Sequence, residues 1–235
     1  EMCAKIKSGS RDFKDIPGLI YKSENDYKKT GEKICDYKRT GPNYAMDHEM
    51  FSDTTVSIDW KSIPYERYWD QIESFYEKPD INETRTVRIF TTNYCPFDCL
   101  FCSSTNFLNA AGGSENKKRA NVAGLTPEEI MTMLNEILES HPTTRNIFIN
   151  DDDFVLQAVR VQKFCDLVCE AKEKNVLPGY LTFMCLSRVD DIEEDTLSKM
   201  KAADFKMIGY GVESFSHKML DDLNKRVKVE QIDKT

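Results

Sequence analysis

The chain has 235 residues, of which 40% are hydrophobic and 31% are charged. This composition is typical of a globular protein of one or two domains with a sizeable core. The formal net charge of -8 argues against a nucleic-acid substrate, because binding to phosphates depends on clustered Lys and Arg. No run approaches the ~18 apolar residues of a membrane-spanning helix, so we expect no insertion into a membrane.

Eight cysteines raise the question of disulfides, but the sequence does not favour them. The chain is long and opens with no apolar signal segment, unlike the small secreted domains that depend on disulfides. Three of the cysteines, Cys95, Cys99 and Cys102, are grouped in the manner of metal ligands. We therefore expect a reducing, cytoplasmic environment.

The first 84 residues show little regular pattern. Residues 1–10 are predicted to be the end of a helix that stops at Gly9, and residues 16–21 and 33–37 are predicted to be two strands of a surface hairpin. Residues 46–84 are predicted to be a connector. Its aromatic rings either anchor it to the following domain or line a ligand-binding face, and their large area favours anchoring. These rings are Tyr65, Tyr68, Trp69, Phe75 and Tyr76.

An apolar run at residues 87–91 leads into Cys95, Cys99 and Cys102. This spacing lets one tight loop place three thiolates around a compact metal cluster. Three thiolates leave one iron of a four-iron cluster without a protein ligand, and an open position is what a metal site needs to bind a substrate. Zinc would require a distant fourth ligand, since the next Cys or His is His141, and a ferredoxin-like carrier would require another nearby cysteine.

From residue 85 the pattern alternates strands and helices. Thr126, Pro127 and Glu129 form a predicted capping box that starts a helix. The alternation indicates an α/β fold of parallel strands and crossover helices. A closed barrel of eight units takes roughly 250 residues, so we expect a partial barrel, incomplete at its C-terminus. The predicted strands are residues 87–91, 146–150, 180–186 and 205–212, and the further helices are residues 155–174, 193–202 and a segment from Phe215.

The cysteine spacing, with the aromatic Phe101 before the last cysteine, resembles the motif of the radical S-adenosylmethionine (radical SAM) enzymes. The resemblance implies a partial parallel (β/α) barrel and a 4Fe-4S cluster held by Cys95, Cys99 and Cys102. It also implies that S-adenosylmethionine (SAM) chelates the open iron. An electron from an external flavodoxin or ferredoxin would then yield a 5′-deoxyadenosyl radical.

Polar residues follow the three later strands, where parallel α/β folds place their chemistry. Asp151 and Asp152 resemble the family element that faces the methionine amino group, with helix capping as the alternative. Arg188 could pair with the SAM carboxylate, or form an ordinary ion pair. Gly211 and Glu213 resemble the family's later barrel signature: Gly211 would let the backbone approach the ligand, and Glu213 would contact its ribose or methionine end, with helix capping as the alternative for Glu213.

The Ile-Pro-Gly-Leu element at residues 16–19 resembles that of radical SAM proteins with an N-terminal cobalamin-binding domain. On this resemblance, residues 1–45 are predicted to be the remnant of such a domain and its hairpin. Residues 46–84 are the connector, and residues 85–235 are the radical SAM core. Cobalamin would come from the missing part of the N-terminal domain.

The first functional hypothesis is a radical SAM enzyme that performs methyl transfer or rearrangement on a small organic substrate. The alternatives are a tRNA methylthiotransferase-like enzyme, which the acidic charge disfavours, and a non-catalytic iron-sulfur module. Cys165, Cys169 and Cys185 are predicted to be core residues, since free cysteine behaves as a small hydrophobe. The basic run at residues 117–119 is predicted to be a solvated loop. The histidines lie in no motif and are assigned no role: His48, His141 and His217.

Replacing Cys99 with Ala should abolish cluster assembly, because the loss of one of three thiolates leaves too few ligands. Replacing Arg188 with Ala should leave the cluster intact and weaken SAM binding about 10- to 150-fold, the effect of losing a charge-assisted pair. Iron analysis measures the first effect, and equilibrium SAM binding measures the second. Normal SAM affinity in the Arg188→Ala variant would show that the assignment of Arg188 is wrong.

Overall fold

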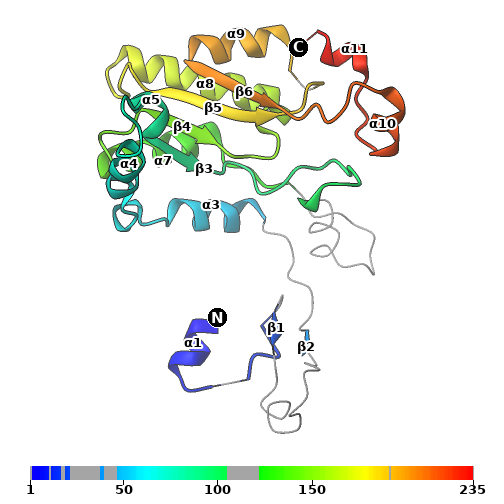
Figure 1. Ribbon diagram of the computed structural model, residues 1–235. Coiled ribbons are helices and arrows are strands. Elements are labelled where there is room, and N and C mark those ends of the chain that lie inside the picture. The colour runs from blue at the N-terminus through cyan, green and yellow to red at the C-terminus, as the bar shows by residue number, and fades with distance from the viewer. Residues whose placement is uncertain are drawn as a thin grey trace. The chain divides into compact units, whose positions relative to one another are not determined.

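The computed structural model describes residues 2–10, 12–16, 19–21, 38–39, 47–104, 122–190 and 192–234. The chain divides into two compact units, Glu1–Ala45 with Ser103–Asn121 and Met46–Cys102 with Val122–Thr235. The larger unit holds the four-stranded sheet and its helices (Figure 1). The strand predicted at residues 33–37 and the basic run at residues 117–119 lie outside the described residues. None of the helices in the described ranges has the length and apolar character needed to cross a membrane.

The smaller unit begins with α1, Met2–Lys7, which ends before Gly9 as predicted. Gly9 has a φ of 79°, a left-handed conformation that glycine adopts without a steric penalty. Further along, β1, Ile20–Tyr21, pairs antiparallel with β2, Lys38–Arg39. An antiparallel pair is therefore present, with Lys38–Arg39 as the described part of its second strand.

The sheet of the larger unit has four parallel strands in the order β3-β4-β5-β6. Because every neighbouring pair of strands is parallel, their carboxyl ends all lie along one edge of the sheet (Figure 1). The predicted α/β fold, an open part of a parallel barrel, is confirmed. The strand bounds are Thr86–Ile89 for β3, Asn146–Ile149 for β4, Thr182–Ser187 for β5 and Phe205–Tyr210 for β6.

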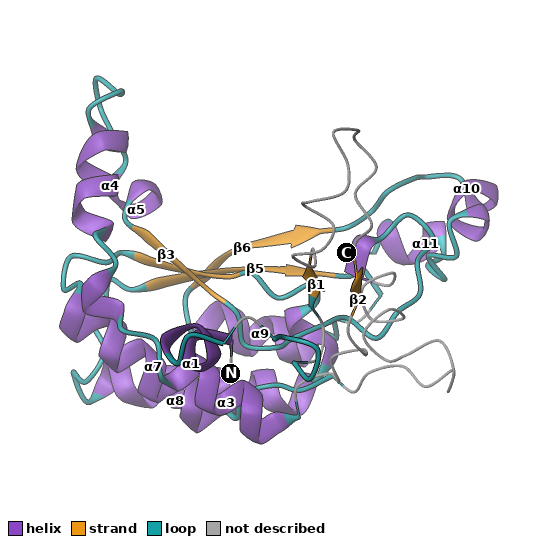
Figure 2. Ribbon diagram, turned by 90° about the horizontal axis from the view of Figure 1, so that it is seen from below, coloured by secondary structure: helices purple, strands orange, loops and turns teal. Residues whose placement is uncertain are grey.

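Three long helices cover one face of this sheet: α7, Pro127–Ser140; α8, Ala158–Glu173; and α9, Glu194–Ala202. Figure 2 shows all three on the same side. The strands alternate with period two, so Val87, Ile147 and Phe183 are fully buried in the core while Arg88 is exposed. Burial of each such apolar side chain contributes about 1.5–3 kcal/mol. Cys165 and Cys185 are buried in the same core, as predicted.

Local signals in the sequence explain where the elements begin. The capping box of α7 is confirmed: the Glu129 amide donates to Thr126 Oγ1 at 3.2 Å, and the Thr126 amide donates to Glu129 Oε2 at 2.6 Å. The helix predicted at residues 155–174 is a short 3₁₀ turn, Phe154–Leu156, followed by α8. After β6 come two short helices, α10, His217–Asp222, and α11, Val229–Ile232.

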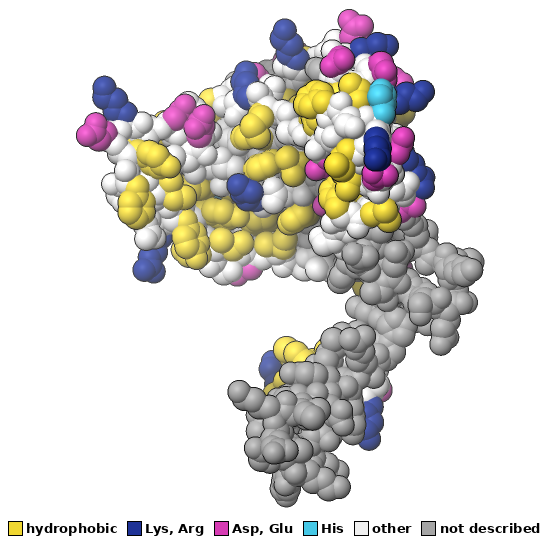
Figure 3. Space-filling model, turned by 45° about the vertical axis from the view of Figure 1, so that its right-hand side comes forward, with side chains coloured by type: hydrophobic (Ala, Val, Ile, Leu, Met, Phe, Trp, Pro, Cys, Tyr) yellow, Lys and Arg dark blue, Asp and Glu magenta, His cyan; other side chains and the backbone are white. Residues whose placement is uncertain are grey.

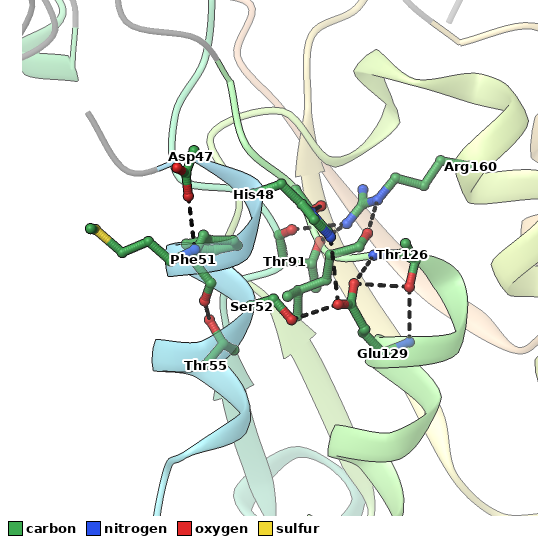
Figure 4. A network of polar contacts seen from close by, with 12 residues as sticks. Asp47, His48, Phe51, Ser52, Thr55, Thr91, Thr126, Glu129 and Arg160 are labelled. Atoms are coloured by element: carbon green, nitrogen blue, oxygen red, sulfur yellow. Dashed lines mark hydrogen bonds and ion pairs between the residues drawn. The ribbon is translucent and has the colours of Figure 1, made fainter. Parts of the chain in front are cut away.

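The connector contains more helix than its sequence indicated. It consists of α3, His48–Val56; a 3₁₀ turn, Trp60–Ser62; α4, Tyr65–Glu73; and α5, Ile81–Thr84. Trp69 is 2% exposed and belongs to the main core, so the anchoring role is confirmed for this ring. Phe75 and Tyr76 are exposed. Ser52 of α3 donates to Glu129 at 2.5 Å, which ties the connector to α7 (Figure 4).

His141, which lies in no motif, joins α7 to the connector. It is 2% exposed, and its Nδ1 lies 2.8 Å from Glu66 Oε1 while its Nε2 lies 2.8 Å from the Trp60 carbonyl. The ring packs against Tyr65 in a T-shaped arrangement, with a centroid separation of 5.1 Å. Both ring nitrogens thus contact oxygen acceptors, and the imidazole fixes the connector against the end of α7.

We predict that His141→Ala lowers the free energy of unfolding by about 2–4 kcal/mol, because it removes the buried contact with the Trp60 carbonyl and the partly buried contact with Glu66 and leaves a cavity. Urea denaturation measures this loss. His217→Ala is the matched control, since His217 is exposed and pairs only with the exposed Glu230 among the described residues. The control should change stability by less than about 0.5 kcal/mol. A similar small change in both variants would contradict the role of His141.

Candidate functional site

The loop that carries the three cysteines starts at the carboxyl end of β3. Its base is held by residues 122–125: the Asn93 amide donates to the Ala123 carbonyl at 3.0 Å, and the Ala123 amide donates to Asn93 Oδ1 at 2.7 Å. The Leu125 amide donates to the Thr91 carbonyl at 2.8 Å. Cys99 is buried, Cys95 and Cys102 are partly buried, and all three are free thiols. The loop therefore leaves the sheet along a fixed path.

The donor set of this loop fits an iron-sulfur cluster. Burial, together with the smaller effect of the nearby carboxylates of Asp153 and Asp152, raises the pKa of the Cys95 thiol to about 11. Metal ions bind the thiolate, so cluster binding has to replace this proton. Among the described residues, no group of three or more His, Cys, Asp or Glu side chains is arranged to hold a single metal ion. A cluster does not require the three thiols to converge on one ion, because each cysteine would bind a different iron.

Arg188 lies directly against the cysteine loop. It is 4% exposed, its guanidinium lies over the Phe97 ring at 3.7 Å, and its Nη1 is 4.0 Å from Cys99 Sγ. Nη2 donates to Asp190 at 2.7 Å and to the Lys225 carbonyl at 3.0 Å. The alternative ion pair with Asp190 is thus present. Contact between Arg188 and a SAM carboxylate stays a prediction. The contacts of Arg188 with Phe97 and Cys99 were not predicted from the sequence.

Asp151 contacts the start of the cysteine loop. Its fully buried carboxylate accepts hydrogen bonds from the Thr91 amide at 2.6 Å, the Thr91 hydroxyl at 2.5 Å and the Thr92 amide at 3.1 Å. Arg160 of α8 donates to the Thr91 carbonyl at 3.0 Å and to the Leu125 carbonyl at 2.7 Å (Figure 4). Burial raises the pKa of Asp151, while the hydrogen bonds from Thr91 oppose this shift. Asp151 therefore links β4 to the point where the loop begins.

Asp152 differs from Asp151 although the two are adjacent. Its side chain is exposed, and its charge reaches Cys95, whose pKa it raises. Asp153 is buried and accepts a hydrogen bond from Ser187 Oγ at 3.1 Å. The predicted ligand contacts of Asp151 and Asp152 stay predictions, and of the two only Asp152 is exposed to solvent.

The end of β6 brings together three further residues. Lys225, which is buried, donates to Glu213 Oε1 at 3.4 Å, and its ammonium lies 5.8 Å from the centre of the Phe101 ring. A Cβ added to Gly211 would lie 3.1 Å from both Glu213 Oε1 and Lys225 Nζ, so this position leaves little room for a side chain. Glu213 has a φ of 63°, a left-handed conformation that is uncommon for Glu and often marks functional sites.

The face of the sheet opposite the helices is open and largely apolar. A groove of about 960 Å³ runs over this face at the amino ends of the strands and is lined by Arg88, Phe148, Met184 and Met207 among others. Figure 3 shows hydrophobic side chains gathered on the exposed surface of this unit. Arg88 lies over the Phe148 ring, 4.7 Å from its centre. The cysteine loop lies at the opposite, carboxyl ends of the strands.

Comparison with protein families decides the classification. The family described as the Radical SAM superfamily matches residues 89–235, which include the cysteine loop and all four strand ends. The chain belongs to the Radical SAM superfamily. No match was found among the curated proteins.

Several solved structures share the fold of this radical SAM chain. The cobalamin-dependent S-adenosylmethionine radical enzyme OxsB, with aqua-cobalamin and SAM bound, has 17% identity and a TM-score of 0.62, with 98% of this chain and 28% of that chain covered. The radical SAM methyltransferase TsrM from Kitasatospora setae, with tryptophan and a SAM analogue bound, has 14% identity and a TM-score of 0.64, with 99% and 40% covered. The chain thus spans less than half the length of these proteins.

Sequence reasoning missed several residues that support the cysteine loop. Thr91 and Arg160 lie in no motif, and their roles follow from the sheet register and the position of α8. Lys225 ends the Leu-Asp-Asp-Leu-Asn-Lys run that resembles the family's barrel signature. Nothing in the sequence indicates that its ammonium lies near the Phe101 ring.

We predict that Asp151→Asn lowers the free energy of unfolding by about 1–3 kcal/mol, because an amide cannot accept all three hydrogen bonds and leaves a buried donor unpaired. Asp152→Asn is the matched control and should leave stability within about 0.5 kcal/mol. Urea denaturation measures both. If Asp152 contacts SAM as predicted, only the control should weaken SAM binding at unchanged stability. Equal stability losses would contradict the distinction between the two carboxylates.

Proposed function

We propose that this chain is the catalytic core of a radical SAM enzyme in which Cys95, Cys99 and Cys102 bind a 4Fe-4S cluster. The observation that carries the proposal is the family match, which extends over a loop with three free thiols at the carboxyl end of β3. The spacing and the free state of the thiols fit three ligands to one cluster. When bound, a cluster of this kind supplies the electron that cleaves SAM.

The residues around the loop would bind and orient the ligand. Phe101 borders the last cysteine, and Asp152 offers an exposed carboxylate for the amino group of SAM. Arg188 would contact the carboxylate of SAM from beside Cys99. Gly211 and Glu213 would accommodate the ribose or methionine end at β6, where the absence of a Cβ keeps the strand end open. An external electron donor of flavodoxin or ferredoxin type would supply the reducing equivalent in a reducing cytoplasm.

We further propose that the reaction is methyl transfer or rearrangement on a small organic substrate, with cobalamin as a second cofactor. The support is the fold similarity to OxsB and TsrM, which are cobalamin-dependent or bind cobalamin. The similarity extends over nearly the whole of this chain, including the segments before the cysteine loop. The net charge of -8 favours a small molecule over a nucleic acid.

The experiment is anaerobic reconstitution with iron and sulfide, followed by reduction and addition of SAM. The protein should hold about four irons per chain and release 5′-deoxyadenosine, and S-adenosylhomocysteine should form if methylcobalamin is used. Cys102→Ala should lose the iron and both products. The control Cys169→Ala, which changes a partly buried thiol of α8, should retain them. A filled cluster with neither product would instead support a non-catalytic iron-sulfur module.

A further inference from the structure

A turn far along the chain contacts the cysteine loop through its backbone. The Leu100 amide donates to the Leu223 carbonyl at 2.9 Å, at the end of α10. Two residues later in the turn, the Lys225 carbonyl accepts a hydrogen bond from Arg188 at 3.0 Å. Arg188 in turn stacks on Phe97 of the loop. The turn at residues 223–226 therefore holds the loop both directly and through Arg188.

Two side chains of this turn contact the middle of the loop. Asn224 Nδ2 donates to the Asp98 carbonyl at 3.1 Å, and Arg226 Nη2 lies 2.9 Å from the Asp98 carboxylate. Asp98 lies between Cys95 and Cys99, whereas Leu100 lies between Cys99 and Cys102. The turn thus contacts both intervals of the cysteine motif.

The conformation of the turn is unusual for its residues. Asn224 and Arg226 have φ values of 52° and 58°, in the left-handed region. Asn tolerates this region, but it is costly for Arg, so surrounding contacts have to compensate. The turn is anchored by the buried residues Leu220, Lys225 and Val227. This anchoring lets the turn present Asn224 and Arg226 to the loop at fixed positions.

We propose that Asn224 and Arg226 are positioning residues that hold the cysteine loop in its cluster-binding conformation before the cluster is bound, and that they slow loss of the cluster afterwards. The proposal rests on the proposed function, since it concerns the loop of the three cysteines. Without these two side chains, Asp98, which directly precedes Cys99, loses both of its contacts with the turn. The loop of such a variant would lose conformational entropy when the cluster binds, whereas the loop of the wild type is already ordered in the folded protein.

The first test uses the protein without a cluster, so it does not depend on the proposed function. Native-state hydrogen exchange should show the Leu100 amide protected in the wild type, because it donates to Leu223. Asn224→Gly with Arg226→Gly removes both side-chain contacts while glycine tolerates the positive φ values. Exchange at Leu100 should become roughly tenfold faster in this double variant. Lys218→Ala, an exposed change on α10, should leave it unchanged. An unprotected Leu100 amide in the wild type would overturn the proposal.

The second test measures iron release to a chelator from the reconstituted protein. The double glycine variant should release iron roughly tenfold faster than the wild type. The single variant Arg226→Lys should release iron at nearly the wild-type rate, since it keeps Asn224 and a positive charge opposite Asp98. A wild type that binds no iron would contradict the proposed function, and the exchange result would still decide this inference. A wild type and double variant with equal iron release would overturn the positioning role.

Discussion

The carboxylate of Asp151 joins the ends of β3 and β4, and the position of the cysteine loop depends on it. Three hydrogen bonds from Thr91 and Thr92 to this carboxylate hold the segment between β3 and the loop. Arg160 donates a further hydrogen bond to the Thr91 hydroxyl oxygen. A buried carboxylate is costly unless its oxygens are satisfied, so this arrangement tolerates little displacement. Consequently the loop leaves the sheet at one place and in one direction.

Much of the fold follows from short-range patterns in the sequence. The capping box of Thr126 and Glu129, the apolar strand residues such as Ile147 and the cysteine spacing each concern residues close together in the chain. These patterns predicted the four strands, the three covering helices and the cysteine loop. They did not predict α3 and α4, because these short helices are stabilised by tertiary contacts such as those of Trp69 and Ser52.

The same reasoning explains what was missed at the candidate site. The Asp-rich run predicts carboxylates at the end of β4, but the run alone cannot indicate that Asp151 turns inward while Asp152 is exposed. That difference depends on the register of β4 beside β3, which places Asp151 against the Thr91 amide. Likewise, contacts between Asp98 and Arg226 join residues distant in the chain, and no local pattern reports them.

Three separate segments hold the cysteine loop in place. Residues 122–125 hold the base of the loop, Arg188 lies against Phe97 and Cys99, and the turn after α10 holds Asp98 and Leu100. Burial raises the pKa of Cys95 to about 11, so this thiol is neutral at physiological pH and no thiolate charge has to be buried at this position. If the loop binds a cluster as proposed, the metal would have to replace the proton of Cys95, because metal ions bind the thiolate form.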